Sequence, residues 1–334
     1  MIFGRHSYSL LKTIVSNRTF ASIASTEMTE PIVHRKLVKF QKVDGKTAEV
    51  QAVYEDSLSS GSSVGTVVAF HGSPGSHKDF KFIRQKLDAM GVRFIGINYP
   101  GFKQTEGYAG QDHSNEERQS YTNAFLKDMS LSGKVIFLAH SRGCENALMT
   151  ATTFPATGLV MMNPVGLRLH KSLRPLSRYQ RLESVYNMLP KFLGDAMIYK
   201  MYHSFGLKVQ DGEEAINALR SVIRCGLDKT LPYIQKLQEQ DTKNFIIFAG
   251  RDIIVEEEII FESLKEYKDL EHFDYEDYIP SEDFSKILKT FDSGKGASVF
   301  VKNNKHYQNK ARADLVAEVV RKILDLDTVK KNKL

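Results

Sequence analysis

The chain has 334 residues, two cysteines and a net charge of +6, which residues 1–26 and the last six residues supply in equal shares of +3. The sequence between these ends is therefore neutral, and composition gives little support for nucleic-acid binding. Two cysteines form no disulfide framework and indicate a reducing compartment, and no apolar run approaches the roughly eighteen residues of a membrane span.

The first residues have the composition of a mitochondrial import peptide. Apolar side chains share one face of a helical wheel opposite Arg5 and Lys12, serines are interspersed, and no acidic residue precedes Glu27. Residues 18–22 (RTFAS) resemble a matrix-processing site. We therefore expect a transit peptide over residues 1–21 and a mitochondrial location, with the cytoplasm as the alternative.

The first strongly buried strand is predicted over residues 66–70 (TVVAF), a short run of β-branched and aromatic residues. It ends in a loop of small residues from His71 to Gly75, which can bring a backbone amide, expected to be that of Ser73, beside a reacting group. We expect His71 to be a structural hydrogen-bonding residue rather than a proton carrier. Another strand is predicted over residues 94–98.

A buried strand breaks into a helix at Ser141, within the segment KVIFLAHSRGCENA. Two very small residues, Ala139 and Gly143, flank the serine two positions away on each side. This pattern predicts a nucleophile elbow, a strained turn that exposes the serine hydroxyl at the carboxyl end of the sheet. The next amide, that of Arg142, opens a helix and can point at an oxyanion. The alternative is an ordinary strand-to-helix turn with a non-catalytic serine.

A strand predicted over residues 158–162 ends at Asn163, and a long insertion follows from about residue 165 to about residue 241. Its clearest helical register lies in residues 213–225. Between Arg168 and His203 the insertion holds seven basic and two acidic residues, a net charge of +5. Three interpretations stand: solvated outer faces of helices, a surface for anionic lipid or an acidic substrate, and docking onto an acidic segment.

The strand predicted over residues 244–249 (NFIIFA) stops just before Asp252, which places this carboxylate at the carboxyl end of a strand. An aspartate before a helix can also be a plain helix N-cap. The last strand is predicted over residues 297–301 (ASVFV); His306 follows after a short polar loop, and a helix starts near Ala311. Here the alternative is a surface histidine.

A second insertion, acidic in character, separates these two strands over about residues 256–295. From Glu256 to Asp283 there are twelve acidic and two basic residues, interleaved with aromatic side chains. Aromatic residues at this density argue against a disordered tract. We expect a solvated helix with an acidic, partly docked loop, and a functional site is the alternative.

Four motifs, each behind a predicted strand, carry a resemblance to a known family. They are His71–Gly72, Ala139–His140–Ser141–Arg142–Gly143, Gly250–Arg251–Asp252 and Lys305–His306–Tyr307. In this order the chain resembles the α/β-hydrolase superfamily from about Arg35 to Leu326. The loop after residues 94–98 departs from the family pattern, because its second glycine is missing.

The resemblance implies an α/β fold, with a mostly parallel, doubly wound sheet over residues 30–326 and a helical cap formed by residues 165–241. It also implies the roles of the site residues: Ser141 as nucleophile, His306 as base, Asp252 as the acid that orients it, and the amides of Ser73 and Arg142 as the oxyanion hole. An aspartate nucleophile, as in dehalogenases and epoxide hydrolases, is disfavoured because position 141 is serine.

We therefore expect a serine hydrolase, resembling carboxylesterases and lipases, that cleaves an ester or a related acyl bond of a small-molecule or lipid substrate. No cofactor is expected, and no metal, because no cluster has metal-ligand spacing. Peripheral contact with a membrane is compatible with the basic insertion. Two alternatives remain: a binding or scaffold protein that kept the fold, and an acyltransferase or cofactor-free oxidative enzyme on the same triad.

Overall fold

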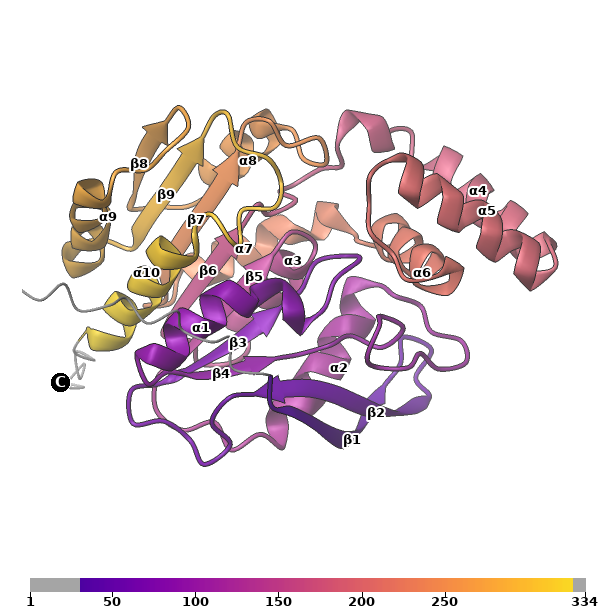
Figure 1. The fold of residues 1–334 in the computed structure, drawn as a ribbon, viewed down its shortest axis with the longest axis horizontal. Helices are drawn as coiled ribbons and strands as arrows, with labels where there is room; N and C mark the ends of the chain where they lie inside the picture. Colours follow the sequence, from indigo (N-terminus) through magenta and orange to yellow (C-terminus); the bar gives the residue numbers. More distant parts are fainter. Residues whose placement is uncertain (1–30, 327–334) are drawn as a thin grey trace, which may run out of the picture. The chain divides into compact units, whose positions relative to one another are not determined.

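The computed structural model describes residues 31–326, and the expected import peptide lies outside them. Within this range nine strands form one sheet in the order β1-β2-β4-β3-β5-β6-β7-β9-β8 (Figure 1). β1 and β2 form an antiparallel hairpin at one edge, β2 pairs antiparallel with β4, and the remaining pairs are parallel. The strands are β1 Val33–Gln41, β2 Thr47–Asp56, β3 Thr66–Phe70, β4 Arg93–Gly96, β5 Val135–His140, β6 Gly158–Met162, β7 Lys243–Ala249, β8 Leu270–Tyr275 and β9 Gly296–Val301.

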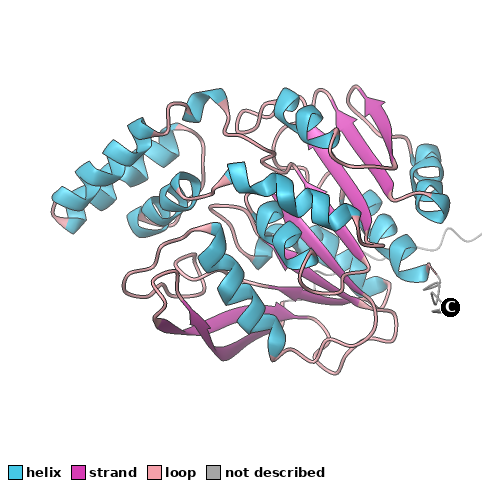
Figure 2. Cartoon of the chain, turned by 180° about the vertical axis from the view of Figure 1, so that it is seen from behind, coloured by secondary structure: helices cyan, strands magenta, loops and turns pink. Residues whose placement is uncertain are grey.

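Helices cover both faces of this sheet, so its central strands are buried on both sides and their sequences are continuous apolar runs. One face packs against α1 Lys81–Ala89, α9 Ser281–Ser293 and α10 Ala313–Asp325. The opposite face, which is turned toward the viewer in Figure 2, packs against α2 Asn115–Lys127, α3 Gly143–Ala151, α7 Thr230–Gln238 and α8 Glu257–Leu264. The expected doubly wound α/β fold is confirmed.

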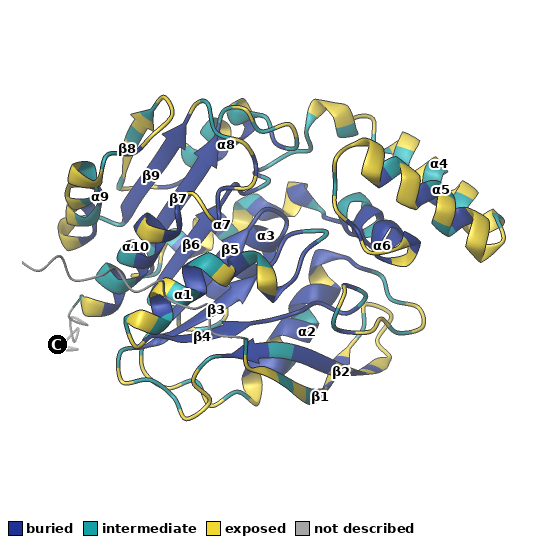
Figure 3. Cartoon of the chain, viewed as in Figure 1, coloured by how far each residue is buried: buried dark blue, intermediate teal, exposed yellow. Residues whose placement is uncertain are grey.

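The insertion between β6 and β7 is helical. It contains η2 Lys171–Leu173, α4 Ser177–Met188, α5 Lys191–Ser204, α6 Gly212–Ile223, η3 Leu227–Lys229 and α7. The α4–α5 hairpin and α6 extend beyond the edge of the sheet layer (Figure 1), with exposed outer faces on α4 and α5 (Figure 3). Because α7 packs against α3, the part that can act as a cap is α4 to α6.

The acidic segment between β7 and β9 differs from the expected helix and loop. It folds as α8, the edge strand β8 and α9, and β8 pairs parallel with β9. Phe273 and Tyr275 pack against the core, whereas Glu271, His272 and Asp274 are exposed. Charged side chains on an edge strand hinder pairing with a further chain. A short 3₁₀ helix, η1 His77–Phe80, precedes α1.

Among residues 31–326, no helix is both long and apolar enough to span a lipid bilayer.

Candidate active site

Ser141 lies between the end of β5 and the start of α3, in a left-handed backbone conformation with φ +53°. Its N–H donates a 2.9 Å hydrogen bond to the carbonyl of Met162 at the end of β6. At Gly143 a Cβ atom would lie 2.2 Å from the carbonyl oxygen of Phe70, so only glycine fits. The left-handed conformation of Ser141 and the need for glycine at position 143 therefore follow from the close packing of the ends of β3, β5 and β6.

His306 and Asp252 contact each other at the same edge of the sheet. The Nδ1 atom of His306 lies 2.6 Å from Oδ2 of Asp252, and both side chains are almost fully buried. Asp252 follows β7, whereas the N-cap residue of α8 is Glu256, so Asp252 is not a helix N-cap. His306 is not a surface histidine, since it is 4 % exposed.

Asp252 accepts hydrogen bonds on both oxygens. Oδ1 accepts from the amides of Ile254 at 2.8 Å and Val255 at 3.1 Å, and Oδ2 also accepts from Nδ2 of Asn163 at 2.9 Å. Burial opposes ionisation of this carboxyl, but the hydrogen bonds from His306, Ile254 and Asn163 outweigh it and lower its pKa below the ordinary value of 3.8. Asp252 is therefore an anion at neutral pH and fixes the hydrogen of His306 on Nδ1.

The two other histidines of the motifs are structural. His140 is buried, which lowers its pKa to about 3, and its Nε2–H donates to the carbonyl of His306 at 3.1 Å. His71 is also buried, with its pKa well below the ordinary value, and its Nδ1–H donates to the carbonyl of Gly72 at 2.7 Å. Its Nε2 accepts from the amide of Tyr99 at 3.1 Å. Both rings are neutral and hold loops in place.

The loop after β3 packs directly on Ser141. A Cβ atom at Gly72 would lie 3.1 Å from Cβ of Ser141, and Ser73 lines the same pocket as the serine. Within residues 31–326 no acceptor is bonded to the backbone N–H of Ser73 or of Arg142. One of these amides belongs to the pocket residue Ser73, and the other directly follows the pocket residue Ser141 in the chain.

Ser141 and His306 both line a cavity of about 190 Å³ that residues of α4, α5 and α6 border. No Lys, Arg, Asp or Glu is among its lining residues. The wall comes mainly from apolar and aromatic side chains of α4, α5, α6 and the loop after β7, which are Tyr179, Met201, Tyr202, Phe205, Leu219, Val222, Ile253 and Ile254. The site can therefore receive a neutral, apolar group.

Among the basic residues between Arg168 and His203, Lys191 pairs within the insertion, with Asp195 at 2.8 Å and Glu213 at 3.1 Å, and the others divide into two groups. Arg168 pairs with Glu262 at 2.9 Å, and Arg174 pairs with Glu256 at 3.0 Å, so these cations dock onto the acidic segment. Arg178, Arg181 and Lys200 are exposed, and no ion pair joins them to another of the described residues. The docking interpretation therefore accounts for the start of the insertion and leaves the α4–α5 hairpin unexplained.

Three residues at the site were missed in the sequence. Asn163 supports Asp252, and its Oδ1 accepts from Nε2 of Gln308 at 2.8 Å. Ser221 of α6 contacts both Ser73 and Arg142. The only available signal was the position of Asn163 directly after a predicted strand; neither Gln308 nor Ser221 lies in a motif.

Comparisons with known proteins agree with the architecture. The uncharacterized protein F35H12.5 of Caenorhabditis elegans is 26% identical over 352 residues, covering 98% of this chain and 98% of that protein. A thermophilic esterase from Thermogutta terrifontis has a TM-score of 0.60 at 15% identity, covering 87% of this chain and 98% of its own. The haloalkane dehalogenase DatA from Agrobacterium tumefaciens has a TM-score of 0.57 at 14% identity, covering 87% of this chain and 96% of its own. At these identities the two solved structures show the fold alone.

A family model described as "Alpha/beta hydrolase of unknown function (DUF1057)" matches residues 30–325, which is most of the chain. The protein belongs to this family of α/β hydrolases.

Proposed function

We propose that the protein is a serine hydrolase that cleaves a carboxylic ester or a related acyl bond. The observation that carries the proposal is the 2.6 Å contact between His306 and Asp252 beside a pocket that Ser141 also lines. A serine alone is a weak nucleophile and needs a base that a third group orients. Ser141, His306 and Asp252 supply these three roles.

In the first half-reaction Oγ of Ser141 attacks the acyl carbon while its proton passes to Nε2 of His306. Asp252 stabilises the imidazolium that forms. The amides of Ser73 and Arg142 stabilise the negative oxygen of the tetrahedral intermediate, each worth roughly 3 kcal/mol. Collapse of the intermediate breaks the bond to the leaving alcohol, which takes the proton from His306, and leaves an acyl ester on Ser141.

In the second half-reaction His306 removes a proton from water, which attacks the acyl ester. The acid leaves, and the proton returns to Ser141. If an alcohol or amine enters in place of water, the same steps transfer the acyl group, so an acyltransferase is the nearest alternative. A binding or scaffold protein that kept the fold is the alternative without chemistry.

The pocket favours a neutral, apolar acyl group, because its lining lacks side chains with a fixed charge. A lipid ester fits this requirement. We also propose peripheral contact with a membrane through the α4–α5 hairpin, where Met188 is 77% and Phe192 71% exposed. Mitochondrial import of the chain stays a proposal that rests on residues 1–21.

The test is covalent labelling of the full chain by a fluorophosphonate probe, followed by hydrolysis of p-nitrophenyl esters of increasing acyl length. Wild type is expected to be labelled, and the Ser141→Ala and His306→Ala variants are not. Ser172→Ala is the matched control, because Ser172 is another serine of the pocket wall. Absence of labelling in folded wild type would favour the binding protein. Labelling without ester hydrolysis, together with release of p-nitrophenol only after an alcohol acceptor is added, would favour the acyltransferase.

A further inference from the structure

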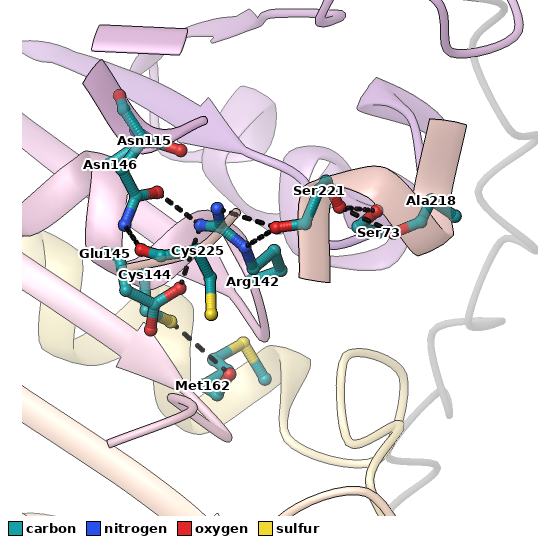
Figure 4. Close-up of polar contacts among 10 residues, drawn as sticks. All are labelled: Ser73, Asn115, Arg142, Cys144, Glu145, Asn146, Met162, Ala218, Ser221 and Cys225. Atoms are coloured by element: carbon teal, nitrogen blue, oxygen red, sulfur yellow. Dashed lines mark hydrogen bonds and ion pairs between the residues drawn. The ribbon is translucent and has the colours of Figure 1, made fainter. Parts of the chain in front are cut away.

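One residue of the cap, Ser221 on α6, contacts both residues that carry the proposed oxyanion donors. Its Oγ lies 2.7 Å from Oγ of Ser73. Its carbonyl oxygen accepts hydrogen bonds from Nε and Nη2 of Arg142, both at 3.1 Å. Figure 4 shows Arg142 and Ser73 reaching Ser221 from opposite sides. Ser221 has no exposed surface.

The helix end explains why an arginine is bound there. Ser221 lies in the last turn of α6, where carbonyl groups lose their partners within the helix and the helix dipole is negative. The guanidinium group of Arg142 satisfies the Ser221 carbonyl with two donors and adds a favourable charge. This contact therefore fixes the carboxyl end of α6 against the first turn of α3.

The direction of the hydroxyl bonds follows from counting protons. Oγ of Ser221 donates to the carbonyl of Ala218 at 2.8 Å, and a hydroxyl has one proton to give. Both contacts of the Ser221 Oγ are hydrogen bonds at the same time only if Ser73 donates to Ser221. The Ser73 hydroxyl is thus committed to the cap, which leaves the backbone N–H of Ser73 as its donor toward the pocket.

The surroundings of Arg142 make this arrangement rigid. Nη1 of Arg142 donates to Asn115 and lies 3.3 Å from a carboxylate oxygen of Glu145. Nδ2 of Asn115 donates in turn to the carbonyl of Cys225, just beyond α6. Arg142, Asn115 and Glu145 are each at most 5 % exposed. If α6 moved away, these buried groups would lose their partners, and a buried polar group without a partner is costly.

We propose that Ser221 is a positioning residue that holds the amides of Ser73 and Arg142 in the geometry of an oxyanion hole, so that the cap sets the catalytic rate as well as the shape of the pocket. This inference rests on the proposed function. Removal of the Ser221 hydroxyl breaks the contact with Ser73 and keeps the carbonyl contact with Arg142. It should consequently affect the transition state more than substrate binding.

The experiment compares Ser221→Ala with wild type in kcat, KM and the rate of fluorophosphonate labelling. We expect kcat and the labelling rate to fall by about 10- to 100-fold at nearly constant KM. Ser263→Ala is the matched control, since Ser263 is a buried serine with the same type of bond, 2.8 Å to the carbonyl of Ile260, on a helix away from the pocket. It should keep the wild-type kcat. Ser221→Thr, which restores a hydroxyl, should recover most of the loss.

Ser73→Ala probes the same contact from the loop and keeps the proposed amide donor, so it decides the matter if Ser221→Ala fails to fold. We expect it to reproduce the loss, and the double variant to be no slower than the slower single variant. If wild type is active and kcat is unchanged in Ser221→Ala or in Ser73→Ala, the inference is overturned and the proposed function stands. Wild type that neither labels nor hydrolyses would overturn both.

Discussion

Nδ2 of Asn163 donates a 2.9 Å hydrogen bond to the same Asp252 oxygen that faces His306. Asn163 stands directly after β6, in a left-handed conformation with φ +48°, and its amide oxygen is held by Gln308. The amide at this strand end supports the carboxylate that follows β7.

Replacing Asn163 with Ala should lower kcat/KM by about tenfold or more, because a hydrogen bond to a charged group is worth about 1.5 to 3 kcal/mol. Loss of this bond also lets the pKa of Asp252 rise toward its ordinary value.

Asp252→Asn should be far slower, by about 10⁴-fold, since the imidazole then loses its productive tautomer. Ester hydrolysis measured at saturating and at limiting substrate gives kcat and kcat/KM for Asp252→Asn and for Asn163→Ala. Equal rates for Asn163→Ala and wild type would show that Asp252 needs no support.

The strand ends that carry Ser141, Asp252 and His306 could be located in the sequence because central parallel strands are continuous apolar runs. The position after each run then marks the same edge of the sheet. β8 could not be found in this way, since LEHFDY alternates acidic and aromatic residues at an edge. Ser221 was equally hidden: its contact with Ser73 spans 148 positions, and no local pattern reports such a pairing.

Ser141→Gly should be more stable than Ser141→Ala, although both should be inactive. The left-handed conformation at φ +53° costs a residue with a Cβ atom about 1 to 2 kcal/mol, and glycine avoids this cost. Part of the gain is offset by the greater freedom of glycine in the unfolded chain. Urea unfolding of the two variants measures the difference. A less stable glycine variant would mean that the turn stores no strain at this residue.

The α4–α5 hairpin should bind vesicles that contain anionic lipid. Arg178, Arg181, Val185 and Met188 are exposed and recur at helical spacing along one face of α4, and the exposed Phe192 lies in the first turn of α5. Reversing Arg178 and Arg181 to Glu should weaken binding about 30-fold or more, because each cation near an anionic surface contributes about 1 kcal/mol. The double variant Met188→Ser with Phe192→Ser should weaken binding to neutral vesicles as well as to anionic vesicles. Sedimentation with vesicles of defined composition provides the measurement.

The controls for this prediction are matched in charge and exposure. Lys268→Glu with Lys289→Glu reverses two exposed cations away from the hairpin, and Val43→Ser removes an exposed apolar side chain near the β1–β2 turn. These variants should bind vesicles as wild type does. If they weaken binding as much as the hairpin variants do, the attraction is a property of the whole surface. Binding that no variant changes would remove the membrane from the proposal.

The Arg142–Glu145 pair should leave a signature in the pH dependence of stability. Burial raises the pKa of Glu145 from its ordinary value of 4.5 to about 7, against the opposing effect of Arg142. Between these two values the folded protein holds a proton that the unfolded chain has released, so the stability contributed by Glu145 is full below about pH 4.5 and is lost as the pH rises to about 7. Glu145→Gln cannot titrate and should therefore gain stability relative to wild type across this window.

The difference in the free energy of unfolding between Glu145→Gln and wild type isolates the effect of Glu145 from that of other groups that titrate in the same pH range. Glu55 and Asp79 are also buried, with pKa values raised to about 7 and about 6, but both are present in wild type and variant. Urea unfolding at half-unit steps from pH 4.5 to 8 should show the stability of Glu145→Gln minus that of wild type rising with pH. A constant difference would mean that Glu145 is ionised throughout, because Arg142 then outweighs the effect of burial on its pKa.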